Sequence, residues 1–117
     1  MSNDLISVIM SSFNSEKTIE DSIQSILNQD YKNIEFLIVD DGSTDNTLRI
    51  MKKLRDKDQR IKIIENTRNI GLTKSLNQLL SISNGRYIAR QDSDDLSFPY
   101  RLTRQINFLK KTNYDIV

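Results

Sequence analysis

Short apolar runs alternate along this chain with stretches in which apolar residues recur at helical spacing, and this alternation limits the fold more than any other feature. The runs are rich in Ile and Val, which is typical of strands buried on both faces. The stretches between and after them carry one apolar stripe each, which predicts amphipathic helices. The predicted strands cover residues 5–10, 34–39, 61–64 and 87–89, and the stripes of the predicted helices cover residues 19–27, 48–54, 72–80 and 102–109.

Strand and helix units in series predict an α/β fold. A strand rejoins a parallel neighbour through a crossover, usually a helix, so we expect a three-layer sandwich with a mostly parallel sheet. The chain has 117 residues, no internal repeat and no Pro/Gly-rich linker, so residues 1–117 are expected to form a single domain. The third helix is expected to end at Asn84-Gly85, a pair that favours a left-handed stop. Residues 115–117 are typical of the opening of a further strand.

Composition excludes several classes of chemistry. The chain has no cysteine and no histidine, which removes disulfides, Cys/His zinc sites, thiol nucleophiles and imidazole bases. A net charge of +1 gives no field that attracts nucleic acid, so no nucleic-acid partner is expected. The N-terminus lacks the basic flank of a signal peptide, and no stretch approaches the roughly 20 apolar residues of a membrane span. We expect this segment in the cytoplasm, with membrane association left open for a longer protein.

Ligands of parallel α/β sheets bind beyond the carboxyl ends of the strands, so the residues that follow each predicted strand are the first candidates for a site. Two of these segments are strongly acidic, Asp40-Asp41 after the second strand and Asp92-Ser93-Asp94 after the fourth. Like charges gathered at one edge of a sheet repel each other in a partly desolvated cleft. We therefore expect Asp41 and Asp94 to converge on one cleft, with a cation and a ligand between them.

Asp92 and Asp94 stand two residues apart, so in extended backbone their carboxylates project to the same side and can face one ligand. A divalent cation such as Mn²⁺ or Mg²⁺ prefers oxygen donors, and phosphate oxygens and water complete its coordination. The motif therefore fits a metal-bound nucleoside diphosphate. The alternative is that Asp94 or Asp95 caps the following helix while the other carboxylates are solvated.

Asp40 and Asp41 also allow two interpretations. A strand end followed by an Asp-Gly turn and a helix cap, Ser43 or Thr44, needs no ligand. A carboxylate in the crevice beyond the strand could instead accept a hydrogen bond from the ring N–H of a pyrimidine or from a ribose hydroxyl. Such a contact would select the nucleotide that enters.

Two motifs in order carry a resemblance to a known family. The segment VIMSSFNSEKTIEDSIQSILNQDYKNIEFLIVDDGSTDNT, followed by GRYIARQDSDD, closely resembles the N-terminal, nucleotide-sugar-binding portion of family 2 glycosyltransferases, which have the Rossmann-like GT-A fold. The similarity spans nearly the whole chain, which would make it a truncated form of that fold. It implies a nucleoside-diphosphate sugar as donor, often a UDP-sugar, together with a divalent cation, Mn²⁺ or Mg²⁺, and inversion at the anomeric carbon.

The resemblance also implies roles for individual residues. Asp94 would contact the metal and the diphosphate, Asp41 would contact the base, and Asp92 would lie nearer the ribose or the sugar. One departure is Ser11, where many members carry proline, and this changes the stiffness of the loop more than its chemistry. The residues implied on the nucleotide side are Ser11, Ser12, Asn14, Asp41, Arg68, Asn69, Gly71, Lys74, Asp92 and Ser93.

An inverting transfer needs a carboxylate base within about 3 Å of the acceptor hydroxyl. In relatives this base lies beyond Val117, so we interpret the chain as the donor-binding part of a longer glycosyltransferase that would be inactive by itself. The acceptor would be a glycan, a lipid or a small molecule. A truncated sheet also leaves an edge and an apolar surface open to a second copy, which allows self-association of this form.

Two other functions fit the same alternation of strands and helices. One is a non-catalytic nucleotide-binding α/β module, which would need no residues beyond this chain. The other is a phospho-acceptor receiver domain, which carries its acidic pair after the first strand. This chain has Ser11-Ser12 at that place, so the receiver fits poorly.

Overall fold

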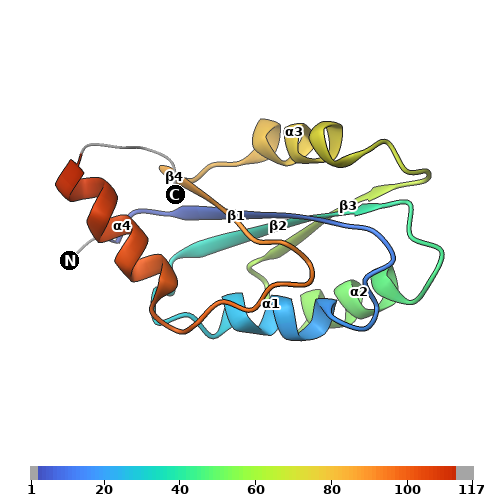
Figure 1. Cartoon of the computed structure of the whole chain (residues 1–117), viewed down its shortest axis with the longest axis horizontal. Helices are drawn as coiled ribbons and strands as arrows, with labels where there is room; N and C mark the ends of the chain where they lie inside the picture. Colours follow the sequence, from blue (N-terminus) through green and yellow to red (C-terminus); the bar gives the residue numbers. More distant parts are fainter. Residues whose placement is uncertain (1–2, 113–117) are drawn as a thin grey trace.

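The computed structural model describes residues 3–112 and shows three layers, with helices on both faces of one sheet (Figure 1). Within that range the sheet has four strands in the order β3-β2-β1-β4, and every neighbouring pair is parallel. The predicted α/β class is confirmed, while the strand expected at residues 115–117 lies outside the described residues. The elements are β1 (Ile6–Ser12), α1 (Ile19–Leu27), β2 (Ile34–Asp41), α2 (Thr47–Lys57), β3 (Ile61–Asn66), α3 (Leu72–Ile82), β4 (Tyr87–Arg90) and α4 (Arg101–Thr112).

Strand β2 lies at the centre of the core, and all of its residues are buried. Its side chains alternate between the two faces of the sheet. Phe36 and Ile38 belong to the larger apolar cluster, which also includes buried residues of α1, α2 and α4. Leu37 and Val39 face the other way and pack with Leu79 of α3 in a smaller cluster. Figure 1 shows the same division, with α3 on one face of the sheet and α1 and α2 on the opposite face.

Two strands continue further toward their carboxyl ends than the apolar pattern predicts. Ser11 and Ser12 belong to β1, where they pair with Val39 and Asp40 of β2. Asp41 in turn pairs with Asn66 of β3. The ladder continues past the last apolar side chain because its hydrogen bonds join backbone groups, which polar residues also carry. The expectation that these residues form loops after the strands is therefore wrong.

The expected left-handed stop at Asn84-Gly85 is also wrong. Helix α3 ends at Ile82, and Gly85 is not among the described residues with positive φ. A Cβ at Gly85 would lie 2.5 Å from the backbone nitrogen of Ser7, so glycine is required by a close approach to β1. The backbone N–H of Gly85 donates to Ser7 Oγ at 2.7 Å, and that of Asn84 donates to the buried Glu35 at 2.6 Å. These bonds fix the start of β4 beside β1.

The strand order places the ligand crevice expected of such a sheet at one point. The chain passes from β1 outward to β2 and β3, and then returns across the sheet to form β4 on the other side of β1. In parallel α/β sheets, ligands bind where the strand order reverses, outside the carboxyl ends of the two strands concerned. In this chain those ends are Ser12 of β1 and Arg90 of β4. Among the described residues, no helix is long and apolar enough to cross a membrane.

Replacing Phe36 by Ala tests the central place of β2 in the core. Phe36 is fully buried, so we expect the substitution to lower the free energy of unfolding by about 3–5 kcal/mol. Phe108→Ala removes the same ring from an exposed position on α4 and should cost much less, about 0.5 kcal/mol. Urea denaturation of both variants measures the difference. Equal losses would contradict the assignment of β2 as the centre of the core.

Candidate functional site

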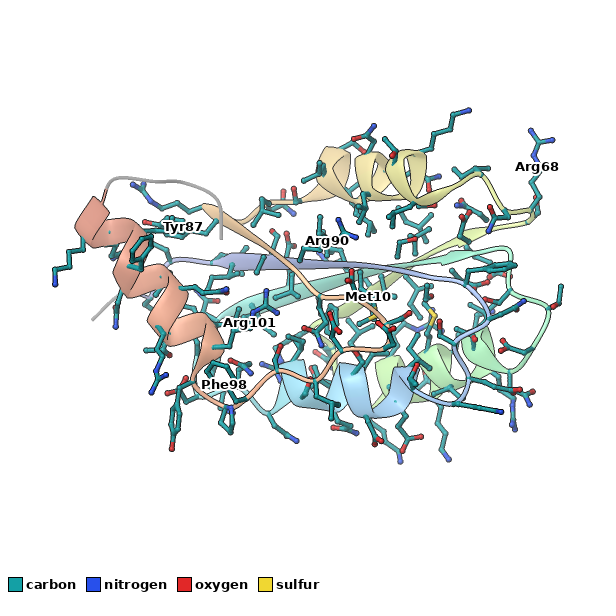
Figure 2. All side chains as sticks on the ribbon, in the orientation of Figure 1. Met10, Arg68, Tyr87, Arg90, Phe98 and Arg101 are labelled. Carbon is teal, nitrogen blue, oxygen red and sulfur yellow. The ribbon has the colours of Figure 1, made fainter. Side chains whose placement is uncertain are left out.

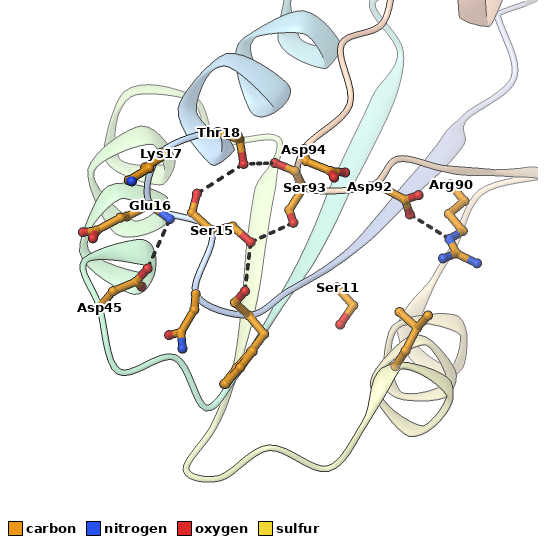
Figure 3. Close-up of a pocket in the computed structure, with 13 residues that line it drawn as sticks. Ser11, Ser15, Glu16, Lys17, Thr18, Asp45, Arg90, Asp92, Ser93 and Asp94 are labelled. Carbon is orange, nitrogen blue, oxygen red and sulfur yellow. Dashed lines mark hydrogen bonds and ion pairs between the residues drawn. The ribbon is translucent and has the colours of Figure 1, made fainter.

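A cavity of about 710 Å³ opens where the ends of β1 and β4 lie side by side (Figure 3). Its walls come from four places in the fold: the end of β1 with the segment leading to α1, the residues just before α2, the first residue of α3, and the end of β4 with the acidic segment behind it. The lining is mostly polar. The residues that line it are Ser11, Phe13, Asn14, Ser15, Glu16, Lys17, Thr18, Asp45, Leu72, Arg90, Asp92, Ser93 and Asp94.

Of the residues predicted after the first strand, Ser11 and Asn14 line the cavity, whereas Ser12 lies in the protein interior. Ser11 lines the cavity, whereas Ser12 is buried and its hydroxyl donates to the carbonyl oxygen of Val39 at 2.9 Å. The structure therefore directs Ser12 into the sheet. Asn14 lines the cavity with a positive φ of 46°, and its Oδ1 accepts a hydrogen bond from the backbone N–H of Thr44 at 2.8 Å. This bond ties the segment after β1 to the segment after β2.

Asp41 is 2% exposed and does not line the cavity. Its two carboxylate oxygens accept hydrogen bonds from the backbone N–H groups of Ile70, at 2.8 Å, and Gly71, at 3.0 Å. The side-chain amide of Asn66 donates to it as well, at 3.2 Å. Burial acts to raise the pKa of Asp41, but these hydrogen bonds outweigh it and hold the pKa below the ordinary value. The carboxylate is thus ionised and fixes the segment that leads into α3.

Two carboxylates that the sequence did not single out line the cavity in place of Asp41. Asp45 accepts hydrogen bonds from the backbone N–H of Thr47, at 2.9 Å, and from its hydroxyl. Burial acts to raise the pKa of Asp45, but its hydrogen bonds lower it on balance. Asp45 therefore holds the first turn of α2. The expectation that Ser43 or Thr44 caps this helix is wrong.

Glu16 is bonded to the same turn, since its Oε2 accepts a hydrogen bond from the backbone N–H of Asn46 at 3.3 Å.

The acidic segment after β4 brings three carboxylates together. Oxygens of Asp92, Asp94 and Asp95 all lie within 4.8 Å of one another, and the three side chains are exposed. The backbone here is a turn and not the extended strand that we expected, because the N–H of Asp95 donates to the carbonyl oxygen of Asp92 at 3.1 Å. The predicted approach of Asp92 and Asp94 is confirmed, and Asp95 joins them. The alternative role as a helix cap is excluded, since α4 begins only at Arg101.

Oxygen atoms at this spacing fit a hard divalent cation, whose oxygen ligands lie about 2.0–2.6 Å from the ion. The exposure of the three carboxylates leaves room for phosphate oxygens or water in the same coordination sphere. Arg90 lies beside them, with its Nε 3.1 Å from Asp92 Oδ1 (Figure 3). The turn therefore offers a cation site at the edge of the cavity.

The segment before α3 contributes little to the cavity. Arg68, Asn69 and Lys74 are exposed, and only Leu72 of this region is among the lining residues described. Arg68 points away from the body of the sheet in Figure 2. Gly71 adopts a positive φ of 97°, and its backbone N–H donates a hydrogen bond to Asp41. Of the residues predicted here, Gly71 is therefore the one that is bonded to Asp41, through its backbone N–H.

Several lining residues were missed by sequence reasoning. Phe13 is 46% exposed at the cavity and offers an aromatic face. Lys17 and Arg90 are the cations of the lining. The search for polar residues directly after each strand could not find Lys17, which lies five residues beyond β1, or Arg90, which lies within β4. The signal that could have found Arg90 is its position two residues before Asp92 on the edge strand.

The chain matches the family model described as Glycosyl transferase family 2 over residues 7–117. It is 53% identical over 114 residues to EpsE of Bacillus subtilis, a protein whose glycosyltransferase name is itself provisional. That match covers 96% of this chain and 41% of the relative, so the chain spans about two fifths of the relative's length.

Solved structures have the same fold. TarS 1-349 of S. aureus, in complex with UDP-GlcNAc, has a TM-score of 0.83 and 34% identity, over 91% of this chain and 31% of that one. The mannosyltransferase PcManGT of Pyrobaculum calidifontis, in complex with GDP-Man and Mn²⁺, has a TM-score of 0.82 and 27% identity, over 89% of this chain and 32% of that one.

Asp41→Asn tests the anchoring of the segment before α3. The substitution keeps the volume of the side chain but replaces one acceptor oxygen by an NH₂ group that faces backbone N–H donors. We expect a loss of about 1–3 kcal/mol in the free energy of unfolding at pH 7, measured by urea denaturation. Asp21→Asn, at an exposed position of α1, should change it by less than about 0.5 kcal/mol.

The pH dependence of the free energy of unfolding, compared between the wild type and Asp41→Asn, gives a second test. The folded-state pKa of Asp41 lies below its ordinary value of 3.8, so its charge stabilises the fold above that pH. This contribution is lost as the pH falls through the folded-state pKa. The difference in stability between the wild type and Asp41→Asn should therefore narrow as the pH is lowered below about 4. A difference that stays constant with pH would contradict a role for the charge.

Proposed function

Because this chain belongs to glycosyl transferase family 2, we propose that it forms the donor-binding part of an enzyme that moves a sugar from a nucleoside diphosphate to an acceptor hydroxyl. The observation that carries the proposal is the convergence of three carboxylates beside a cavity at the point where the strand order reverses. The parallel sheet explains the position of the cavity, and the three carboxylates explain why it would bind a divalent cation together with a diphosphate.

The size of the cavity supports a ligand as large as a nucleotide sugar. Its volume of about 710 Å³ lies within the range of about 300–1,000 Å³ that is usual for small-molecule sites. Ser11 and Asn14 would lie beside the nucleoside, and the exposed ring of Phe13 offers a surface on which a base can stack. Asp41 does not line the cavity, so it would support the base side indirectly, through the bonds that hold Ile70 and Gly71 in place.

The charge of the lining explains why a divalent cation would be required. A diphosphate would meet four carboxylates and only two cationic side chains, so its own negative charge would be repelled. A cation on the acidic turn reverses this balance. The carboxylates of the lining are Glu16, Asp45, Asp92 and Asp94, and the cations are Lys17 and Arg90.

Asp94, with Asp92 and Asp95, would hold this cation, for which we propose Mn²⁺ or Mg²⁺. When bound there, the ion would stabilise the negative charge that collects on the diphosphate as the glycosidic bond breaks. Arg90 stands next to Asp92 and would contribute a second positive charge to the same leaving group. PcManGT, whose structure contains GDP-Man and Mn²⁺, supports this combination of a nucleotide sugar and a metal.

The remaining carboxylates of the lining are poorly suited to act as the catalytic base. A base must accept a proton, but Asp45 is committed to three hydrogen bonds that lower its pKa. Glu16 is held by the backbone of the α2 turn. The proposal therefore assigns donor binding and assistance to the leaving group to the described cavity, and it assigns no base within it. We propose a UDP-sugar as the donor, supported by the complex of TarS with UDP-GlcNAc.

Calorimetric titration of the chain with UDP, GDP and CDP, with and without Mn²⁺, tests this function. We expect binding of UDP that requires the metal and that is lost, by at least about tenfold in affinity, in Asp94→Ala. Asp56→Ala removes an exposed carboxylate of α2 that is remote from the cavity, and it should bind like the wild type. Equal affinity in Asp94→Ala and the wild type would remove the metal role from Asp94. Binding that does not depend on metal would favour a nucleotide-binding module of another kind.

A further inference from the structure

The three carboxylates of the acidic turn repel one another, yet they lie within 4.8 Å while exposed to solvent. Among the described residues only Arg90 forms an ion pair with one of them, Asp92, and Arg101 attracts Asp92 and Asp95 without forming an ion pair, so ion pairing alone does not explain the cluster. The backbone beneath them must therefore be held by other groups. These groups determine whether a cation finds its ligands already in place or must order them at the cost of affinity.

One face of α1 supplies a first set of such groups. Ser22 and Ser25 belong to α1, Thr18 directly precedes the helix and Gln29 lies two residues beyond its end; the spacings of four, three and four residues place them along one side of α1. Each of them bonds to the backbone of the segment between β4 and α4. The bonds are Thr18 Oγ1 to Ser93 O at 2.9 Å, Ser22 Oγ to Asp92 O at 2.8 Å, Ser97 N to Ser25 Oγ at 3.0 Å, and Gln29 Nε2 to Phe98 O at 2.8 Å.

Gln91 supplies the second group. It is 3% exposed and lies directly before the acidic turn. Its Nε2 donates to the carbonyl oxygen of Asp95, at 2.8 Å, and to Ser22 Oγ, at 3.0 Å. Ser22 in turn donates to the carbonyl oxygen of Asp92. Ser22 and Gln91 therefore bond to each other and to the two ends of the turn that carries the carboxylates.

The orientation of the Gln91 amide is fixed by its other end. Oε1 accepts hydrogen bonds from the hydroxyl of Ser97, at 2.7 Å, and from the guanidinium of Arg101, at 2.9 Å. A rotated amide would place its NH₂ group against the guanidinium of Arg101, which can only donate. The same guanidinium donates to the carbonyl oxygen of Arg90 at 2.7 Å, which holds the end of β4. The amide of Gln91 must therefore point its donors at the turn.

On the basis of the proposed function, we propose that Ser22 and Gln91 are positioning residues, which hold the turn from Asp92 to Asp95 so that its carboxylates converge on one divalent cation. Neither residue lines the cavity, so neither would touch the cation or the nucleotide. They act through the carbonyl oxygens at positions 92 and 95. Groups that orient metal ligands in this way typically contribute a factor of about 10–100 to metal affinity.

Ser22→Ala and Gln91→Glu test the proposal in two ways. Ser22→Ala removes the donor to Asp92 O and leaves a residue that favours a helix. Gln91→Glu keeps the acceptor for Ser97 and Arg101 but loses the donor to Asp95 O. By charge alone, an added carboxylate near the turn would strengthen the binding of a cation. Positioning predicts the opposite sign, so weaker binding in Gln91→Glu distinguishes the two effects.

The measurements are the affinity of the 117-residue chain for Mn²⁺ by calorimetry, the exchange rate of the Asp95 amide by NMR, and the midpoint of thermal unfolding. We expect both variants to bind Mn²⁺ about tenfold more weakly and to exchange the Asp95 amide faster. Ser81→Ala is the matched control, since Ser81 is an exposed serine of α3 whose hydroxyl bonds only within its own helix among the described residues. It should match the wild type in affinity and in exchange.

The outcomes separate this inference from the proposed function. Unchanged Mn²⁺ affinity in both variants, with binding lost in Asp94→Ala, would overturn the positioning role and leave the proposed function intact. If the wild type binds no Mn²⁺, the metal part of the proposed function fails, and the exchange of the Asp95 amide alone decides whether Ser22 and Gln91 hold the turn. Should one variant fail to fold, the other carries the test.

Discussion

The parallel pairing of β1 with both β2 and β4 is the constraint on which the rest of the structure depends. Because β1 has neighbours on both sides, the chain must leave it toward β2 and later return to add β4. The carboxyl ends of β1 and β4 consequently lie next to each other, although some eighty residues separate them in sequence. The cavity, the acidic turn and the exposed ring of Phe13 all occupy this one edge of the sheet. The close approach of Gly85 to Ser7 maintains this pairing at the opposite end of the strands.

The carboxylates of Asp41, Asp45 and the acidic turn serve two purposes, according to whether hydrogen bonds already occupy their oxygens. Asp41 is buried and its oxygens are occupied by backbone N–H groups, so its charge organises the segment that leads into α3. Asp45 is similarly committed to the first turn of α2. The carboxylates of the turn after β4 are exposed and have ligand positions to spare, which suits them to a cation. The difference between Asp41 and the carboxylates of the acidic turn follows from the cost of burying a charge, which hydrogen bonds must offset when the group is removed from water.

Much of the fold could be predicted from the sequence, because apolar periodicity is a local signal. Every predicted strand and helix within the described residues is present, and the acidic motif lies at the expected edge of the sheet. The predicted convergence of Asp41 and Asp94 on one cavity is only half correct, since Asp94 lines the cavity and Asp41 does not. Local pattern could not reveal this difference. The hydrogen bonds that occupy Asp41 come from residues 25 to 30 positions away in sequence.

The sequence by itself determined the order of strands and helices and the absence of histidine and cysteine chemistry, and it singled out Asp92-Ser93-Asp94 as the motif at which we propose that a cation binds. Only the tertiary structure decided where the strands end, which carboxylates face the cavity, and how Ser22, Gln91 and Arg101 hold the acidic turn. The physical reason is that apolar periodicity can be read from neighbouring residues in the sequence. The hydrogen bonds of a polar group, in contrast, depend on partners that folding brings from distant segments.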